Sequence, residues 1–325
     1  MPTPLSRRGA LAAAALLALG LPGAVLAQAF PAKPLTFVVP FAAGSATDQL
    51  ARALGQSVTE QTKQAVVVEN KAGASGMMAA QAAARAPADG YTVLITTNTT
   101  HAANEHLYKK LPYDAVKDFA PVTGLGKGGQ VMVVNVNSPY KTVGDVVAAA
   151  KKSPGKLSFG SGSSSSRMAG EMLKQLSGTD ILHVPYKSNP MGITDLLGGQ
   201  IDFMITDTST GVPQVKAGKL RALGYSTQKR STQLPDVPTI DEAGVKGYDM
   251  GYWFAAYVPA GTPAPVVARL NELLGAAVRS TAARTFFDTA GSEAWTTTPD
   301  ELAKFQTAET LKWGKVIKAA GIEPE

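Results

Sequence analysis

The segment from Leu35 to Val58 constrains the fold most strongly, because it reads as a strand, a tight loop and a helix in direct succession. Leu35–Val39 is a short apolar run rich in β-branched residues, which is typical of a buried strand, and Pro40 ends it because proline has no N–H to donate to a ladder. Phe41–Thr47 is a run of mostly small residues that forms a turn. From Asp48 onward, apolar residues recur at helical spacing.

The start of the expected helix carries the features of an anion site. Ser45 stands at the N-cap position and Asp48 follows three residues later, an arrangement close to a capping box. The first N–H groups of a helix have no internal acceptor and lie at the positive end of the helix dipole, where anions bind. Gly44 lets the backbone approach a ligand. Taken alone, the segment favours an ordinary strand–helix connection with a good cap. The interpretation as an anion site needs support from the rest of the chain.

Strands and helices alternate through the first hundred residues. Ala65–Glu69 and Tyr91–Thr96 have the composition of buried strands, and an alanine-rich helix that ends near Ala86 lies between them. This order predicts a parallel sheet with right-handed crossovers, in which the loops at the carboxyl ends of the strands line the ligand crevice. Three loops of mainly small or hydroxylic residues occupy these positions: Phe41–Thr47, Asn70–Gly76 and Thr97–Ala103.

The rest of the chain continues this pattern, with a second α/β set inserted in the first. Further strands are expected at 131–136, 157–160, 183–186, 201–206, 220–226 and 252–258, and helices at 142–152, 168–176, 193–197, 263–279 and 301–318. We therefore expect residues 30–135 and 250–325 to form a discontinuous first lobe and residues 136–249 to form a second lobe. Gly124, Gly126 and Gly129 match the spacing of a dinucleotide-binding loop, but no strand–loop–helix unit surrounds them. We interpret these glycines as a flexible crossing between the lobes.

The N-terminus has the features of a bacterial signal peptide. Arg7 and Arg8 precede an apolar run that ends near Leu19, and small residues suited to cleavage follow. We expect residues 1–27 to be the signal peptide and the mature protein to reside in the periplasm. The paired arginines resemble a twin-arginine signal, and the run is too short and too rich in alanine for a membrane anchor.

Composition excludes several classes of function. The chain of 325 residues has no cysteine, which rules out thiol catalysis, iron–sulfur clusters and disulfides, and its three histidines lack metal-ligand spacing. The net charge is +6, but the basic residues are scattered rather than gathered in the stripe that nucleic-acid binding needs. No motif places a base beside a serine nucleophile. We expect a monomer without metal, cofactor, catalysis or nucleic-acid binding.

Collinear motifs extend over nearly the whole mature chain. They include VVPFAAGSATDQLAR at 38–52, VVVENKAGASG at 66–76, ADGYTVLITT at 88–97, LYKKLPYDAVKDFAPVT at 107–123, HVPYK at 183–187, TDLLGGQID at 194–202, KAGKLRALGYSTQKRSTQLPDVPTIDEAG at 216–244 and VPAGTP at 258–263. This set resembles the extracytoplasmic solute receptors of tripartite tricarboxylate transporters, also called the Bug family. The resemblance implies an α/β fold of the two-lobed periplasmic binding protein type (type II-like), with parallel or mixed sheets flanked by helices. It also implies that a small carboxylate, either a di- or tricarboxylate or an aromatic acid, binds in the interlobe cleft and is delivered to membrane transporter subunits.

The same resemblance implies the site residues. In the family, the carboxylate is held largely by backbone amides of the loop that matches Phe41–Asp48, with help from ordered water. The candidate ligand contacts are Phe41, Ala43, Gly44, Ser45, Thr47, Asp48, Thr97, Thr99, Ser161, Ser163, Ser164, Arg167, Tyr186, Lys187 and Asp207. A carboxylate at Asp48 would repel an anion, so we expect it to face away and cap the helix or pair with Arg52. The chain departs from the family at Ser45, where a glycine is usual, and at Arg167, where a histidine is common.

Two other functions remain open at this stage. A sensor subunit that presents its ligand to a signalling partner would use the same closed cleft. An exported hydrolase is the less favoured alternative, because it needs a nucleophile with an adjacent base.

Overall fold

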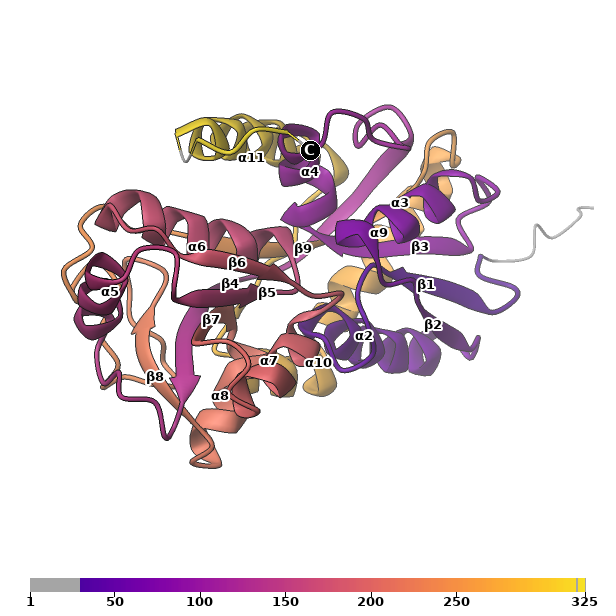
Figure 1. Ribbon diagram of the computed structural model, residues 1–325. Coiled ribbons are helices and arrows are strands. Elements are labelled where there is room, and N and C mark those ends of the chain that lie inside the picture. The colour runs from indigo at the N-terminus through magenta and orange to yellow at the C-terminus, as the bar shows by residue number, and fades with distance from the viewer. Residues whose placement is uncertain (1–29, 320, 325) are drawn as a thin grey trace, which may run out of the picture.

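A computed structural model describes residues 30–319 and 321–324. Two lobes lie side by side, joined by the long strand β4 (Phe119–Asn135), whose first part pairs in the first lobe and whose second part pairs in the second (Figure 1). The expected signal peptide, residues 1–27, lies outside the described residues. The exact lobe boundaries stay predictions.

The sheet of the first lobe is mixed. β1 (Leu35–Val39) pairs in parallel with β2 (Val66–Asn70) and β3 (Thr92–Thr97). β9 (Gly251–Pro259) returns from the end of the second lobe and runs antiparallel to both β3 and β4, while β10 (Glu293–Ala294) adds a short antiparallel edge to β4. The carboxyl ends of β1 and β3 therefore meet at the edge that faces the second lobe, as expected of parallel strands.

Helices cover both faces of this sheet. On one face, α2 (Ala46–Thr62), α9 (Ala264–Val278) and α10 (Thr281–Ala290) pack with Leu35, Phe37 and Val39. On the other face lie α3 (Met77–Ala84), the π-helical turn η2 (Thr99–Ala103), α4 (Asn104–Leu107) and α11 (Pro299–Ala319). The 3₁₀ turn η1 (Ala74–Gly76) leads into α3. Because both faces are covered, β1 is buried along almost its whole length.

The second lobe has the same layered plan. β5 (Ser158–Ser161) pairs in parallel with β6 (Leu182–Pro185) and β7 (Phe203–Asp207), and β4 lies antiparallel between β7 and β8 (Leu220–Tyr225). The helices are α5 (Val143–Lys152), α6 (Ser164–Ser177), α7 (Asn189–Leu197) and α8 (Thr208–Lys216). α6 and α7 both start at loops that follow strands, so both present their N-termini toward the first lobe (Figure 1).

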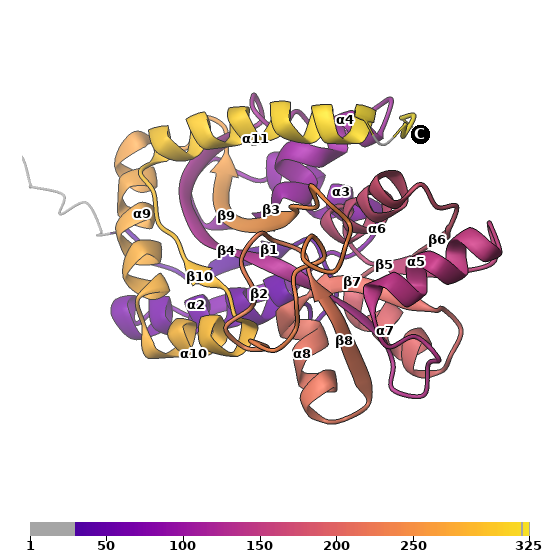
Figure 2. The ribbon, with the colours of Figure 1, turned by 90° about the vertical axis from the view of Figure 1, so that its left-hand side faces the viewer.

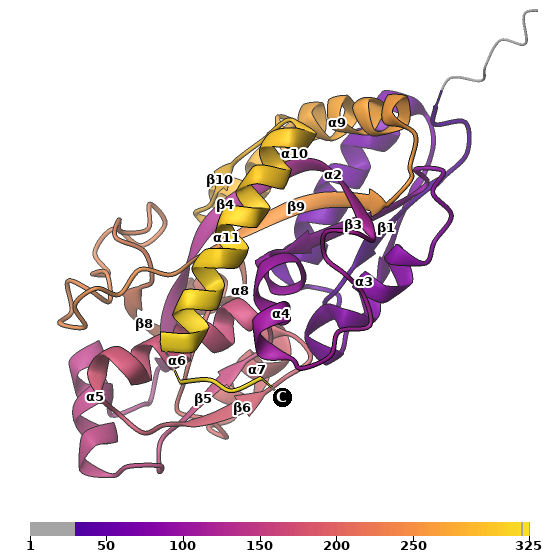
Figure 3. The same cartoon turned by 90° about the horizontal axis from the view of Figure 1, so that it is seen from above.

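The C-terminal helix α11 ties the two lobes together. It begins over the first lobe beside β9 and runs toward α6, as the side view and the view from above show (Figures 2 and 3). At its end, the side chain of Gln175 on α6 donates a hydrogen bond to the carbonyl of Ala319. One hydrophobic cluster accordingly extends from Trp313 in the first lobe to Phe159 in the second. Among the described residues, no helix is both long and apolar enough to cross a membrane.

The glycines at 124, 126 and 129 do lie in β4, the strand that crosses between the lobes, but this strand is regularly paired, so the expected flexibility was wrong. All three pair with residues of β9. Aromatic rings cover them at close range: a Cβ added to Gly124 would lie 2.5 Å from Trp295, and one added to Gly129 would lie 2.6 Å from Tyr225. Glycine is required here because it lets large side chains pack directly on the strand.

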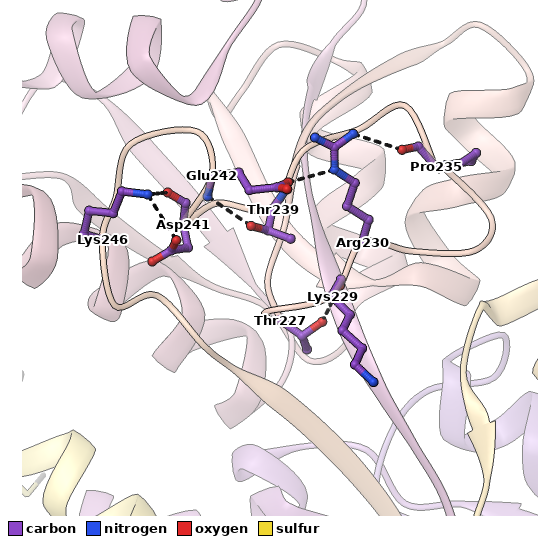
Figure 4. Close-up of polar contacts among 8 residues, drawn as sticks. All are labelled: Thr227, Lys229, Arg230, Pro235, Thr239, Asp241, Glu242 and Lys246. Atoms are coloured by element: carbon purple, nitrogen blue, oxygen red, sulfur yellow. Dashed lines mark hydrogen bonds and ion pairs between the residues drawn. The ribbon is translucent and has the colours of Figure 1, made fainter.

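A long irregular segment, residues 226–250, connects β8 to β9 on the outside of the second lobe. Its own polar side chains hold it (Figure 4): Arg230 Nε lies 2.8 Å from Glu242 Oε2, and the N–H of Thr239 donates to the same oxygen at 2.7 Å. Lys246 pairs with Asp241 at 3.3 Å. These exposed ion pairs contribute little individually to stability.

Candidate functional site

A small cavity lies between the lobes, at the carboxyl ends of β1, β3, β5 and β7. We call it the central cavity. Its lining comprises Phe41, Ser45, Ala46, Thr47, Thr97, Tyr252 and Phe254 from the first lobe and Gly162, Ser163, Ser165, Asn189 and Asp207 from the second. Its volume of about 10 Å³ leaves room for about one water molecule. The lobes are therefore closed on each other, and a ligand can enter only when they separate.

The first turn of α2 lines this cavity with two residues whose backbone N–H groups have no partner inside the helix. Three other N–H groups of the loop already have partners: Gly44 donates to Asp48 Oδ2 at 2.9 Å, Ser45 to the carbonyl of Ala42 at 3.1 Å, and Asp48 to Ser45 Oγ at 3.3 Å. Ala46 and Thr47 occupy the first two helical positions, whose N–H groups have no acceptor inside the helix. Within the loop 41–48 that was expected to supply backbone amides, the N–H groups of Ala46 and Thr47 are therefore the candidate donors to a ligand.

The carboxylate of Asp48 is turned away from the cavity, which confirms that part of the prediction. Its Oδ1 lies 3.0 Å from both Arg52 Nη2 and Asn70 Nδ2. Burial opposes ionisation, but the hydrogen bonds from Arg52, Gly44 and Asn70 outweigh it and hold the pKa of Asp48 below its ordinary value. The negative charge is therefore neutralised behind the loop, and it does not oppose an anion at the helix start.

The second lobe contributes the carboxyl group of Asp207 to the cavity wall. Asp207 Oδ2 accepts hydrogen bonds from Asn189 Nδ2 at 2.8 Å and Thr210 Oγ1 at 3.4 Å. Asn189 also fixes the loop before α6, because its Oδ1 accepts from the N–H of Gly162 at 2.8 Å. Burial raises the pKa of Asp207, and the hydrogen bonds offset this only in part. A protonated Asp207 is able to donate to an anionic ligand.

The start of α6 mirrors the start of α2. Ser163 is its N-cap, with the hydroxyl accepting from the N–H of Ser166 at 3.2 Å. Ser164 and Ser165 occupy the first two helical positions, and Ser165 lines the central cavity. Ser164 Oγ also donates to Asn104 Oδ1 at 2.9 Å, which connects the second lobe directly to the first.

A second cavity adjoins the first and shares Gly162 and Ser163 with it. We call it the basic pocket. Its other lining residues are Ser161, Ser164, Arg167, His183, Pro185, Tyr186 and Lys187 from the second lobe and Ser75 and Tyr108 from the first. Its volume is about 130 Å³. Within the described residues, no cluster of three or more His, Cys, Asp or Glu side chains could hold a metal ion.

Comparison with known families decides which class of protein this site belongs to. Residues 50–322 match the family described as the tripartite tricarboxylate transporter family receptor. The chain belongs to this family. Because the match runs from residue 50 to residue 322, both lobes of the receptor are included.

Solved structures share the fold of this receptor. The periplasmic binding protein BugD is 32% identical, with a TM-score of 0.87 over 91% of this chain and 100% of that chain. Rpa4515 of R. palustris, solved with adipate, is 34% identical, with a TM-score of 0.87 over 91% of this chain and 100% of that chain. MatC (Rpa3494) of Rhodopseudomonas palustris, solved with malate, is 30% identical, with a TM-score of 0.84 over 89% of this chain and 100% of that chain. The receptor therefore has the two-lobed periplasmic binding protein fold, as the sequence predicts.

The structure gathers most of the predicted contacts of this receptor into the two cavities. Phe41, Ser45, Thr47, Thr97, Ser163 and Asp207 line the central cavity, and Ser161, Ser163, Ser164, Arg167, Tyr186 and Lys187 line the basic pocket. The remaining four predicted residues line neither cavity: Ala43, Gly44, Asp48 and Thr99. Ala43 and Gly44 are exposed on the loop, whereas Asp48 and Thr99 are buried behind the cavity wall. Their role as contacts stays a prediction.

Several lining residues were not found from the sequence. Asn189 lies at the start of α7, and the Ser188–Asn189–Pro190 run is a helix-start signal that marks this position. Ser75 lies in one of the three expected crevice loops, although it was not singled out. Tyr252 and Phe254 point from β9 toward the cavity, and no local pattern distinguishes them from core residues.

Proposed function

We propose that this protein is an extracytoplasmic receptor that captures a small carboxylate between its lobes and delivers it to a tripartite tricarboxylate-type membrane transporter. The observation that carries the proposal is that Ala46 and Thr47, whose N–H groups have no acceptor inside α2, line a cavity between the lobes at the positive end of this helix. Rpa4515 with adipate and MatC with malate show that structural neighbours hold small carboxylates. The names of the family and of BugD support a periplasmic location.

Binding follows from the polarity of the site. One carboxylate oxygen accepts from the N–H of Ala46 and the other from the N–H of Thr47, with the hydroxyls of Ser45 and Thr97 beside them. Such charge-assisted bonds are stronger than bonds between neutral groups, and they gain further from the exclusion of water when the lobes close. Micromolar affinity corresponds to about 8 kcal/mol, which a few such bonds can supply after the cost of ordering the ligand.

Closure is what makes the binding useful to a transporter. A ligand shifts an open–closed equilibrium only by its differential affinity for the two states. A ligand held by α2 of the first lobe and α6 of the second contacts both walls only in the closed state. A membrane partner then recognises the surface of the closed, ligand-bound form. A sensor role would use the same closure with a signalling partner.

A hydrolase is the second candidate, and one contact favours it. Ser161 Oγ lies 2.7 Å from His183 Nε2, which is the distance of a nucleophile–base pair. Sequence motifs do not reveal this pair, because the two residues are adjacent only through the pairing of β5 with β6. We assign it to the wall of the basic pocket. The parent protein should hydrolyse p-nitrophenyl acetate no faster than the Ser161→Ala variant does. Faster hydrolysis by the parent would favour the enzyme.

The direct test is to identify the natural ligand. The periplasmic protein is purified without denaturation, the bound compounds are released with acid, and they are identified by mass spectrometry. We expect an unmodified carboxylate that rebinds in calorimetry. Release of a cation or a sugar that rebinds, with no carboxylate able to bind, would contradict the proposed function.

A further inference from the structure

A buried hydrogen bond joins the two lobes directly. Ser164 Oγ, in the first turn of α6 in the second lobe, donates to Oδ1 of Asn104 in α4 of the first lobe at 2.9 Å. Asn104 is 0% exposed and Ser164 is 2% exposed, so both partners are shielded from water when the lobes are closed. Asn104 lines neither the central cavity nor the basic pocket, which separates its contact with α6 from any contact with a ligand.

The first lobe holds the side-chain amide of Asn104 in one orientation. Its Nδ2 donates to the carbonyl of Ser75 at 3.0 Å and to Tyr113 Oη at 3.3 Å. The hydroxyl of Tyr113 donates in turn to the carbonyl of Thr100 at 2.8 Å, so it can only accept from Asn104. Because Nδ2 is held by two acceptors of its own lobe, Oδ1 is left for the second lobe. The acceptor half of the interlobe bond is therefore fixed by contacts that do not need closure.

The second lobe fixes the donor half in a similar way. The loop before α6 is held by Asn189, whose Oδ1 accepts from the N–H of Gly162 at 2.8 Å. The loop is also packed directly on the chain before α7, because a Cβ added to Gly162 would lie 1.9 Å from the backbone carbon of Ser188. Ser164 follows at the first helical position. Since both halves are ordered within their own lobes, joining them costs little conformational entropy.

We infer that Asn104 is a positioning residue whose hydrogen bond with Ser164 latches the lobes shut, whether or not a ligand is bound. The latch joins two groups of the chain itself, so it does not rest on the proposed function or on the identity of the ligand. Separation of the lobes hydrates both groups, and the net gain from such a bond is a factor of about five in the closing equilibrium. Because the cavity opens only when the lobes separate, the latch slows both entry and release of a ligand.

The test measures the separation of the lobes in the protein without ligand. The chain has no cysteine, so spin labels attach only to cysteines introduced for this purpose. Met78 in the first turn of α3 and Met191 in the first turn of α7 are 56% and 46% exposed and lie in different lobes. Double electron–electron resonance on the Met78→Cys, Met191→Cys protein therefore reports how far apart the lobes are. Bound compounds are first removed by dialysis, and mass spectrometry confirms their removal.

The labelled parent should show a population at the distance of the closed structure. Ser164→Ala should raise the ratio of open to closed molecules at least threefold, because the amide oxygen of Asn104 then stays buried without a donor in the closed state and is hydrated in the open state. Asn104→Leu removes the same bond from the first lobe and should also raise this ratio. If Asn104→Leu does not fold, Ser164→Ala decides the question alone.

Ser166→Ala is the matched control for Ser164→Ala. Ser166 lies in the same turn of α6, is 0% exposed, and donates its hydroxyl to the carbonyl of Ile205 at 2.6 Å within the second lobe. Loss of that bond weakens the second lobe equally in the open and closed states, so the ratio should stay that of the parent.

A labelled parent without any closed population would overturn the latch, as would a Ser164→Ala ratio equal to that of the parent or of Ser166→Ala. Because no carboxylate enters the experiment, such a result would leave the proposed function standing.

Discussion

The first turn of α2 and the first turn of α6 face the same cavity from opposite lobes, and each begins with a serine N-cap. Their surroundings differ. In the first turn of α2, the carboxylate of Asp48 is turned away from the cavity and is bound by Arg52 and Asn70, which help to lower its pKa. The first lobe therefore presents backbone N–H groups to the cavity and no titrating group. Across from it, the second lobe presents Asp207, whose pKa is raised by burial, and leads to the basic pocket.

This difference separates anchoring from selection. Backbone donors at a helix start recognise any carboxylate, and they depend little on the side chains around them. Side chains such as Asp207 and Arg167 discriminate between ligands by charge, protonation and reach. We therefore expect changes in the first lobe to alter affinity for all carboxylates, and changes in the second lobe to alter preference.

The largest effect on stability is expected from a methyl group added at Gly162, a residue of the second lobe that lines the central cavity. A Cβ on Gly162 would lie 1.9 Å from the backbone carbon of Ser188, so Gly162→Ala forces the α6 and α7 starts apart. The free energy of unfolding should fall by about 3 kcal/mol, the upper range of overpacking. Urea unfolding followed by circular dichroism measures it.

Gly44→Ala is the comparison variant in the first lobe, on the exposed part of the loop before α2. Gly44 has φ +81° with nothing within 4 Å of an added Cβ, so only the backbone conformation is penalised, at about 1–2 kcal/mol. If Gly162→Ala proves no more destabilising than Gly44→Ala, then Gly162 is not packed more tightly against its surroundings than Gly44 is.

A smaller effect that depends on pH is expected from Asp207→Asn. Because the pKa of Asp207 is raised in the folded protein, the folded state keeps its proton at pH values where the unfolded chain has lost it. The stability of the parent therefore falls as the pH rises from the ordinary value of 3.8 through the raised one. Asparagine cannot ionise, but it still accepts from Asn189.

The variant should therefore gain stability relative to the parent between pH 4 and pH 7.5, by about 1 kcal/mol or about 2–4 °C in melting temperature. Thermal unfolding at the two pH values measures the difference. The same difference at both pH values would show that Asp207 ionises normally in the cavity wall.

The smallest effect is expected at Arg52, which pairs with Asp48 on the side of the loop away from the central cavity. Arg52 is about half exposed, and its ion pair with Asp48 is an i,i+4 surface pair. Arg52→Gln should cost less than about 1 kcal/mol in stability and change the affinity for the carboxylate recovered from the parent protein less than threefold. A tenfold loss in calorimetry would show that Asp48 turns into the cavity once its partner is removed.

The sequence predicts the parts of the site that depend on local rules. Leu35–Val39 is a strand with the predicted bounds, and Ser45 is the N-cap of α2, because hydrophobic run, proline stop and cap are all contiguous. Parallel pairing of β1 with β3 then brings Thr97 to the same cavity. These features need no knowledge of distant contacts.

Other parts depend on contacts that no local pattern contains. α8 is not among the helices predicted from the sequence. Gly211 and Pro213 disfavour a helix, yet Gly211 fits tightly against Val131 of β4, and only the folded packing shows this. The basic pocket forms when the Ser75 loop of one lobe meets Arg167 of the other, and their separation in the chain hides the pocket from motif analysis.

The central claim is that the N–H groups at the start of α2 anchor the ligand, and Ala46→Pro tests it most directly. Proline is favoured at the first helical position, and Ser45, with φ −66° and ψ 160°, already has the conformation that a residue before proline needs. The variant therefore keeps the helix and removes one donor. Thr281→Pro is the matched control, because its N-cap Ser280 has φ −68° and ψ 160° and α10 starts away from both cavities.

Calorimetry with the carboxylate recovered from the purified parent protein is the deciding measurement for these two variants and the parent. The account predicts at least tenfold weaker binding by Ala46→Pro, with Thr281→Pro within twofold of the parent and all three proteins unfolding at similar temperatures. Binding by Ala46→Pro at the affinity of the parent would contradict the assignment of the anchor to α2.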